Sequence, residues 1–155
     1  MTAKFAENVM RMLEDERTVK VLTTVDSSGT PHSVVKNSLR SDEEGNIVCL
    51  ELIESSRTNS NMTGSLWFGR KVSILLVGRD GSSLQIKGRP YKCVVAGPVF
   101  EAHYRETRKQ LGNVDLGAVW IIAPDEIIDE SFETRWREES DAHPLRKHLD
   151  RIRAE

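Results

Sequence analysis

The chain has 155 residues, of which 38% are hydrophobic and 30% charged, and this fits one globular domain with its own core. Its 22 Lys and Arg residues nearly balance its 24 Asp and Glu residues, giving a formal net charge of -2, which argues against a nucleic-acid binder. No apolar run approaches the ~20 residues that cross a bilayer, and the N-terminus lacks a signal-peptide core, so we expect a cytoplasmic protein that does not enter a membrane.

The first predicted element is a helix within residues 1–16. One face of this helix is apolar and consists of Phe5, Val9, Met12 and Leu13. Three strand-like stretches rich in β-branched residues follow, with the sequences "TVKVLTTVD", "PHSVVKNSL" and "GNIVCLELI". Pro31 opens the second stretch, where a proline suits only the start of a strand or an edge.

The middle of the chain predicts a short helix over "TNSNMTGSLWF", interrupted at Gly64, and then a fourth strand, "KVSILLVGR". Asp80-Gly81 is a strong hairpin signal. It leads into a long fifth strand, "SSLQIKGRPYKCVVAG", with a bend expected at residues 88–90.

The last third begins with a helix, "PVFEAHYRETRKQLG", for which Pro98 suits the first turn and Gly112 the end. A sixth strand, "DLGAVWIIAP", follows, and from Asp125 onward the chain is charged and mixed in sign. Apolar residues at helical spacing predict a small C-terminal helix that docks on the body or on a partner. These residues are Leu145, Leu149 and Ile152.

Six strands joined mainly by hairpins, with few and short helices, indicate a mainly β protein with a six-stranded antiparallel barrel. We expect one domain over residues 1–155, with the helix at 1–16, the barrel at 17–128 and a C-terminal tail with a short helix at 129–155. The glycine-rich loops of common nucleotide-binding folds are absent from the sequence.

The segment "ESSRTNSNM", residues 54–62, places hydroxyl and amide side chains around one arginine directly after the third strand. Convergent small donors and a cation suit a phosphate group, with Arg57 as a bidentate donor and the Ser56 and Thr58 hydroxyls beside it. If a helix starts here, its first N–H groups add to the preference for an anion. The alternative is an ordinary helix N-cap next to a solvated arginine.

Cys49 and Cys93 lie in apolar stretches and form no CxxC pair, so we expect free, buried thiols. The four histidines lack the spacing of a zinc site, and no metal is expected. They are His32, His103, His143 and His148.

Four stretches in this order resemble the FMN-binding split β-barrel family, which includes the pyridoxamine-phosphate-oxidase-like proteins and small bacterial FMN-binding proteins. They are "GTPHSVVKNSL", "SSRTNSNM", "LQIKGRP" and "GPVFEAHYRE", and the resemblance runs from about Thr18 to about Ile128. It implies a split barrel that forms a homodimer, with two FMN sites at the subunit interface.

The resemblance also implies a set of cofactor-binding residues. Those expected along the flavin ring and ribityl chain are Val34, Val35, Lys36 and Asn37. Those expected at or near the phosphate are Ser56, Arg57, Thr58 and Asn61, with Lys36 as a second cation. Ser83 matches a position where the oxidases carry a longer glutamine, and Trp120 is expected in the core, at the dimer interface or against the ring.

The resemblance implies a flavin-dependent oxidoreductase with an unidentified substrate. True pyridoxamine-phosphate oxidase activity is not expected, because the C-terminal segment lacks the Arg-x-His-type substrate motif. The alternatives are a non-enzymatic FMN-binding electron carrier, a split barrel that binds haem or a deazaflavin, and an empty barrel acting as a dimeric interaction protein.

Overall fold

The computed structural model describes the backbone of residues 3–153 and the side chains from residue 7 onward. The strands are β1 (Val19–Val25), β2 (Pro31–Val35), β3 (Arg40–Ser41), β4 (Ile47–Glu51), β5 (Val72–Val77), β6 (Ser83–Val94) and β7 (Ala118–Asp129). The helices are α1 (Ala3–Glu14), α2 (Arg57–Phe68), α3 (Pro98–Leu111) and α4 (Phe132–Ala142), with a 3₁₀ turn at Leu149–Arg151. None of these helices is long and apolar enough to cross a membrane.

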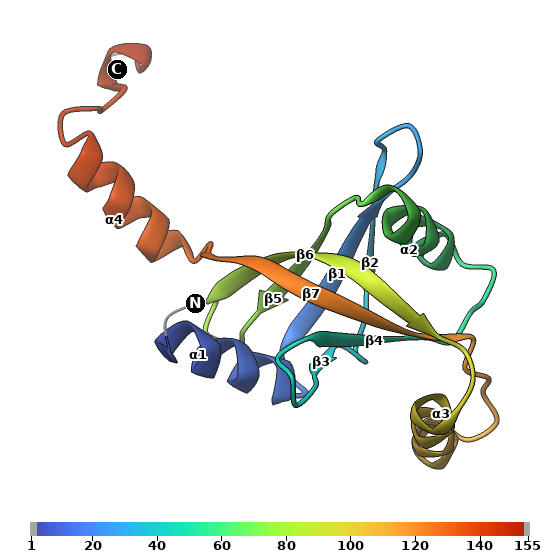
Figure 1. Ribbon diagram of the computed structural model, residues 1–155. Coiled ribbons are helices and arrows are strands. Elements are labelled where there is room, and N and C mark those ends of the chain that lie inside the picture. The colour runs from blue at the N-terminus through green and yellow to red at the C-terminus, as the bar shows by residue number, and fades with distance from the viewer. Residues whose placement is uncertain (1–2, 154–155) are drawn as a thin grey trace.

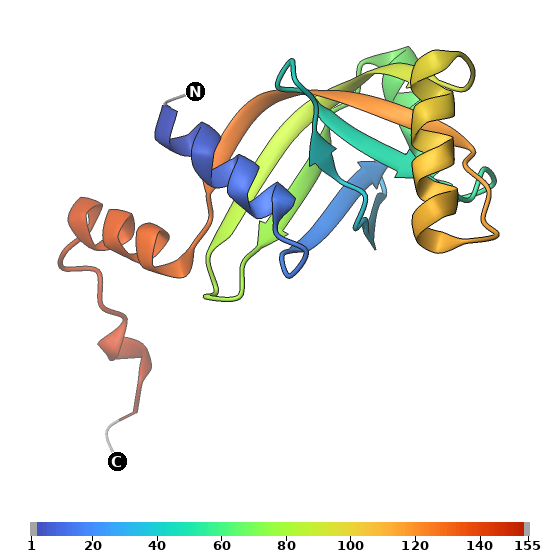
Figure 2. The same ribbon diagram turned by 90° about the horizontal axis from the view of Figure 1, so that it is seen from below.

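All seven strands join one antiparallel sheet in the order β2-β1-β5-β6-β7-β4-β3. Figure 1 shows that this sheet curls into a half-barrel, and Figure 2 shows α1 lying along its open side. The prediction of a mainly β, antiparallel fold is confirmed, but the count of six strands is wrong. The additional strand, β3, has two residues, too few for any alternation of side chains to reveal it.

The main core fills the inside of the curled sheet. Alternate residues of β1 and β5 point into it, including the fully buried Leu22 and Leu76. The buried face of α1 closes it with Val9, Met12 and Leu13, as predicted, whereas Phe5 lies outside the described side chains. Burial of these apolar side chains is the main term that stabilises the fold.

A second, smaller core lies on the outer face of β4 and β7. Val48, Val119 and Ile121 pack there, with Phe100 and Tyr104 of α3 against them. Because β4 and the first half of β7 are covered on both faces, their sequences are continuous apolar runs rather than alternating ones.

The expected bend in the fifth predicted strand is present in β6. Its pairing with β7 shifts register between Lys87 and Gly88 and again between Pro90 and Lys92. The first shift lets β7 continue through Pro124 as far as Asp129, beyond the predicted end of that strand, because a bulge accommodates a residue that cannot donate to the ladder.

Helix α2 runs without interruption through Gly64, so the predicted break there is wrong. Ser56 caps its start and Gly69, at φ 64°, ends it. The buried face of α2, which includes Met62 and Ser65, packs on the barrel, and this packing outweighs the ~1 kcal/mol that a helical glycine costs relative to alanine.

The chain after β7 forms a C-terminal arm, residues 130–153, which projects away from the barrel (Figure 1). The tail at 129–155 contains a short helix, as predicted, but this helix is α4 at Phe132–Ala142. The segment with Leu145, Leu149 and Ile152, where the helix was expected, forms only a 3₁₀ turn at Leu149–Arg151. The apolar side chains of Leu145, Leu149 and Ile152 stay exposed in the single chain. Without packing against another surface, a helix as short as the predicted one is not stable.

The edge strands β2 and β3 are not paired with each other, so the sheet is open between them. Side chains bridge the segment after β2 to the end of β4, and we call this bridge the seam. Lys36 Nζ lies 2.8 Å from Glu51 Oε2, and Ser38 Oγ accepts from Leu50 N at 3.1 Å.

Candidate functional site

The start of α2 is a capped helix end next to the β1–β2 turn. Ser56 Oγ accepts a hydrogen bond from Asn59 N at 3.0 Å, so the N-cap interpretation of this serine is correct. The cap uses only the acceptor side of the hydroxyl, whose hydrogen stays available to a ligand. A serine can therefore cap the helix and donate to an anion at the same time.

Arg57, the first residue of α2, is exposed. Within the described residues no carboxylate lies in salt-bridge range of its guanidinium. The pKa of Asp26 in the neighbouring turn is lowered, chiefly by the Ser28 hydroxyl and the Thr30 amide, with a smaller contribution from the charge of Arg57. The arginine thus places a positive charge without a direct ion pair at the start of the helix.

Thr58 and Asn61, the other predicted phosphate residues, are buried at 3% and 6% exposure. Asn61 Nδ2 donates to Thr24 Oγ1 of β1 at 3.0 Å, which ties α2 to the inside of the barrel. The Asn61 amide is therefore engaged in the core, and the surface position expected as its alternative is not observed.

Asn59, which sequence analysis did not single out, organises this helix start. Its side-chain oxygen accepts from Trp120 Nε1 at 2.9 Å, and its amide donates to Glu54 O at 2.9 Å. Trp120 is 2% exposed and packs in the main core, so of its three expected positions the structure shows the core. Asn59 could have been identified from the sequence, because it lies three residues after the capping Ser56.

The second predicted group, Val34 to Asn37, lies at the end of β2. Val34 packs against the core, while Val35 is 60% exposed and Asn37 is exposed. Lys36 is held by Glu51 across the seam, with side chains 16% and 3% exposed, and Glu51 Oε1 also accepts from Ile53 N at 3.1 Å. The Lys36 ammonium therefore pairs with the Glu51 carboxylate, a partner that was not predicted from the sequence.

A cleft of about 730 Å³ opens beside the seam, between the β2–β3 segment, the end of β4 and the last turns of α3. Its walls combine apolar side chains such as Leu52 and Ile53 with polar ones such as Asn37 and Gln110. An apolar cleft with a few polar groups is the usual form of a small-molecule site.

Lys20, also missed by sequence analysis, lies at the bottom of this cleft. Its Nζ donates to Leu13 O at 2.5 Å and to Leu39 O at 3.4 Å, and desolvation lowers its pKa. Because Leu13 O belongs to the last turn of α1, the ammonium caps that helix at its negative end.

The structure brings the predicted residues together in two groups rather than one. Val35, Lys36 and Asn37 line the cleft, whereas Ser56, Arg57, Thr58 and Asn61 belong to α2. Ser83 lies apart from both: it pairs with Val77, which in turn pairs with Val19, at the end of β1 opposite Thr24 and α2. There Ser83 N donates to Ser131 Oγ at 3.0 Å, at the base of the C-terminal arm.

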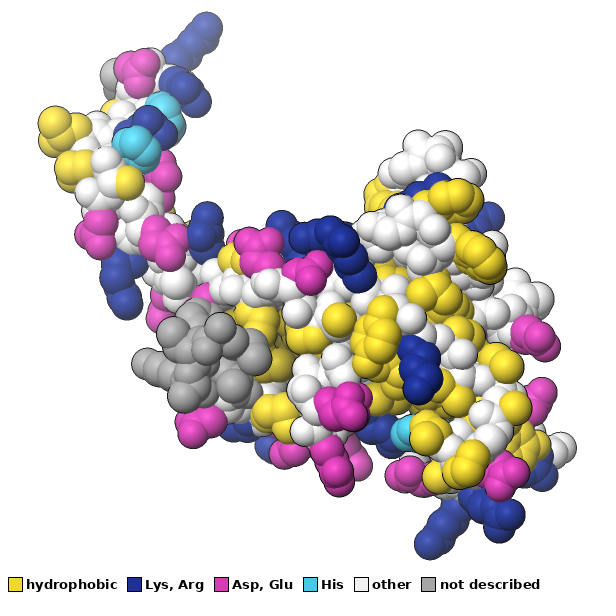
Figure 3. Space-filling view, viewed as in Figure 1, with side chains coloured by type: hydrophobic (Ala, Val, Ile, Leu, Met, Phe, Trp, Pro, Cys, Tyr) yellow, Lys and Arg dark blue, Asp and Glu magenta, His cyan; other side chains and the backbone are white. Residues whose placement is uncertain are grey.

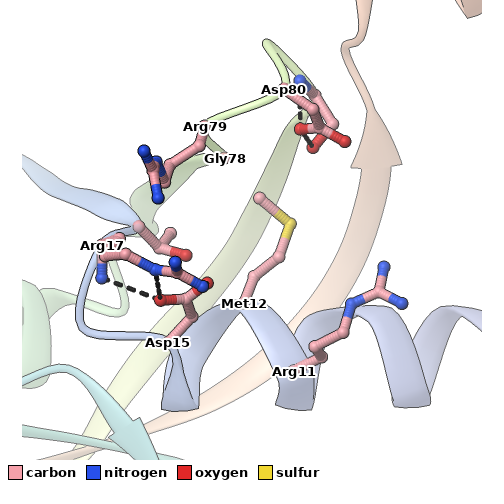
Figure 4. A pocket seen from close by; sticks show the side chains of 9 residues that line it. Arg11, Met12, Asp15, Arg17, Gly78, Arg79 and Asp80 are labelled. Atoms are coloured by element: carbon pink, nitrogen blue, oxygen red, sulfur yellow. Dashed lines mark hydrogen bonds and ion pairs between the residues drawn. The ribbon is translucent and has the colours of Figure 1, made fainter.

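A further cavity of about 660 Å³ lies between α1 and the β5–β6 turn (Figure 4). Arg79 and Arg17 lie on one side of Met12 and Arg11 on the other (Figure 4). The two aspartates there are satisfied locally, since Asp15 binds Arg17 at 3.1 Å and Asp80 accepts from Ser82. The arginines diverge, and the cavity lacks the convergent donors of the α2 start.

The cysteines and histidines of residues 7–153 do not form another candidate site. Cys49 and Cys93 are both free; Cys49 is buried, as predicted, with its pKa raised by burial to about 11, whereas Cys93 is half-buried rather than buried. His103 Nδ1 lies 2.6 Å from Arg40 Nη2. Over the described residues, no three His, Cys, Asp or Glu side chains come close enough to hold a metal ion.

Comparison with solved structures identifies the architecture. An FMN-binding protein from Syntrophomonas wolfei is 14% identical, with 83% of this chain and 88% of that chain covered and a TM-score of 0.70. HupZ of Group A Streptococcus is 20% identical, with 85% and 96% covered and a TM-score of 0.67. A Listeria innocua protein assigned as a pyridoxamine 5'-phosphate oxidase is 16% identical, with 81% and 98% covered and a TM-score of 0.60.

The chain has the FMN-binding split β-barrel fold. Similar split barrels also include an F420 reductase and HutZ, the heme storage protein of Vibrio cholerae, each 14% identical, with TM-scores of 0.57 and 0.58. No family model matches the chain, and no curated protein sequence matches it. At these identities the likeness between the split barrels establishes the fold and not the ligand.

Proposed function

We propose that the protein binds FMN and acts as a flavin-dependent oxidoreductase with an unidentified substrate. The observation that carries this proposal is the start of α2, where a capping serine meets an arginine that forms no salt bridge with any carboxylate of residues 7–153. The similar structure from Syntrophomonas wolfei, described as FMN-binding, supports the choice of ligand.

The residues at this helix start fit a flavin phosphate. A phosphate monoester carries nearly two negative charges and three acceptor oxygens. The Arg57 guanidinium offers a bidentate donor and the Ser56 hydroxyl a further one, and the N–H groups of the first turn of α2 that the Ser56 cap leaves free would add to them. Lys36, bound to Glu51, is not assigned to the phosphate in this proposal.

The cleft beside the seam fits the ring system. Val35, Leu52 and Ile53 would contact its apolar faces, and Asn37 could donate to its polar edge. Glu54 and Ser55 alone separate Ile53 from Ser56, so the loop after β4 joins this cleft to the phosphate-binding helix start. One ligand contacting both groups would explain why polar residues are concentrated in this loop.

A homodimer with FMN at the subunit interface belongs to the same proposal. The outward-facing side chains of β1, β2 and β5 include a row of aliphatic ones beside Thr23, Ser33 and Ser73, and such a row is unusual for a solvated sheet face. Paired positions link Val35 to Val21, Val21 to Leu75, and Val19 to Val77. Val19 and Val35 are 48% and 60% exposed in the single chain, so this face suits contact with a second copy.

When bound, FMN would supply the electron or hydride transfer. The chain would hold the phosphate at α2, orient the ring in the cleft and exclude water with the apolar wall around Ile53.

Visible absorption of the purified protein after addition of FMN and removal of the excess tests the ligand. We expect two flavin bands, and a colourless protein that does not take up FMN would contradict the proposal. Arg57→Ala should weaken FMN binding by roughly 10- to 100-fold, the equivalent of one charge-assisted bond. The matched control is Arg105→Ala, another exposed arginine, on α3, which should leave the affinity unchanged.

The similarity to HutZ and to an F420 reductase makes haem and a deazaflavin the second candidate ligands. A Soret band in the same spectrum would identify haem, and retention of F420 in place of FMN would identify a deazaflavin. Catalytic bleaching of bound FMN by a nicotinamide cofactor would distinguish an enzyme from an electron carrier.

A further inference from the structure

The C-terminal arm carries exposed apolar side chains that do not pack against the barrel. No residue of α4 is buried, and Phe132 and Trp136 are 76% and 51% exposed. Figure 3 shows hydrophobic side chains gathered on the projecting arm. The arm is fixed to the barrel at its base, where Ser131 exchanges hydrogen bonds with Ser83.

These apolar side chains follow one another along the arm. Phe132 and Trp136 stack with centroids 6.2 Å apart and line a shallow groove of about 340 Å³ on α4. Leu145, Leu149 and Ile152 continue the series at helical spacing and are 69–93% exposed. The sequence predicts a helix there, yet the single chain forms one 3₁₀ turn, as expected of a segment that lacks the surface on which it folds.

The charges of the arm divide into two opposite halves. Residues 130–142 carry five acidic and two basic residues, a formal charge of -3, and residues 143–153 carry four basic and one acidic, a formal charge of +3. The halves also contact each other within the chain: Arg146 Nη1 lies 3.5 Å from Glu139 Oε1, and Lys147 Nζ lies 5.0 Å from the centroid of the Trp136 ring. That fold-back still leaves Leu145 93% exposed.

We propose that the arm pairs with the same arm of a second copy of the chain, antiparallel and around a two-fold axis. A two-fold interface requires a self-complementary surface, and an arm with an acidic and a basic half meets this requirement when each half faces the partner's opposite half. Phe132 and Trp136 would then pack on the partner's Leu145 and Leu149. The two halves join near residue 142, and in this pairing the residues there would lie beside the same residues of the second copy.

Cysteine cross-linking of the full-length protein tests this geometry. In a Cys93→Ser background, with Cys49 buried, Ala142→Cys lies at the proposed axis and Glu133→Cys at the far end of the acidic half. Mild oxidation should convert A142C chains to disulfide-linked dimers and leave E133C chains single. A142C chains that stay single, or E133C chains that cross-link equally well, would overturn the pairing.

Charge exchange separates arm pairing from contact with the partner's barrel or with a membrane. E138K/E139K and R146E/K147E, each combined with A142C, should lose most cross-linking alone and recover it when mixed in equal amounts. Recovery on mixing requires acid-to-base contact between two arms. Cross-linking that charge exchange leaves unchanged, or binding of the arm to phosphatidylserine vesicles without any cross-link, would contradict the proposal.

Discussion

Replacement of Lys36 by methionine should test whether the seam holds the barrel together. The change removes the charge but keeps the length of the side chain, and it leaves Glu51, 3% exposed, with its Oε2 unpaired. Loss of one partner of a buried ion pair costs about 3–5 kcal/mol. Since Lys36 is 16% exposed and water can reach its side of the pair, we expect a loss near the lower end, about 3 kcal/mol, in the free energy of unfolding.

Urea unfolding at equilibrium measures this loss as a lower midpoint at an unchanged slope. The control is Lys71→Met, which removes a longer and exposed ion pair, 3.4 Å to Asp125, between side chains 48% and 37% exposed. The control should cost less than about 1 kcal/mol.

The double variant K36M/E51Q separates the buried charge from the other contacts of Glu51. It removes the stranded charge and keeps an acceptor for Ile53 N, and it should therefore be more stable than K36M alone. A cost for K36M no larger than that of the Lys71 control, or a double variant less stable than K36M, would refute the conclusion that the seam is a desolvated pair.

Three further predictions concern other parts of the barrel. Burial, and then the Arg40 charge, lower the pKa of His103 below its ordinary 6.5, so the unfolded chain takes up the proton first and the folded protein should lose stability as the pH falls below 6.5. His103→Gln should remove this component when unfolding is compared at pH ~7.5 and ~5. Asn61→Ala should cost about 1–3 kcal/mol in urea unfolding, because the buried Thr24 hydroxyl loses its donor, while FMN titration of the folded variant should give an unchanged affinity. Gly88→Ala should lower the thermal midpoint by the equivalent of about 1–3 kcal/mol, because its Cβ would lie 2.5 Å from a carbonyl oxygen of β7.

Sequence patterns predicted those parts of the fold whose signals are local. Pro98 and Gly112 delimit α3, and the strand-like stretches "TVKVLTTVD" and "KVSILLVGR" correspond to β1 and β5. The patterns failed where tertiary context decides: β3 exists only because two residues pair with β4, and Gly64 remains helical because the face around it is packed. Helix α4 was not predicted, because it lies in a charged segment, has no side-chain cap and buries none of its residues.

The candidate site was predictable in part for a similar reason. The capping serine and the cation beside it are neighbours in sequence, so Ser56 and Arg57 could be assigned together. The partners of Lys36 and Asn59 lie 15 and 61 residues away, and a single sequence gives no measure of such pairings. Glu51 in particular sits in an apolar strand, where its burial is explained only by the lysine across the seam.

The hydrogen bond from Trp120 to Asn59 also has a consequence for biosynthesis. A ribosome releases the loop after β4 early, but the indole that fixes it belongs to β7, near the end of the barrel. Contacts of such long sequence separation form late, after the entropy of closing the intervening loop has been overcome. The loop after β4 should therefore reach its final form only once nearly the whole barrel has been synthesised, and a ligand held at the start of α2, as proposed, would bind finished molecules rather than nascent ones.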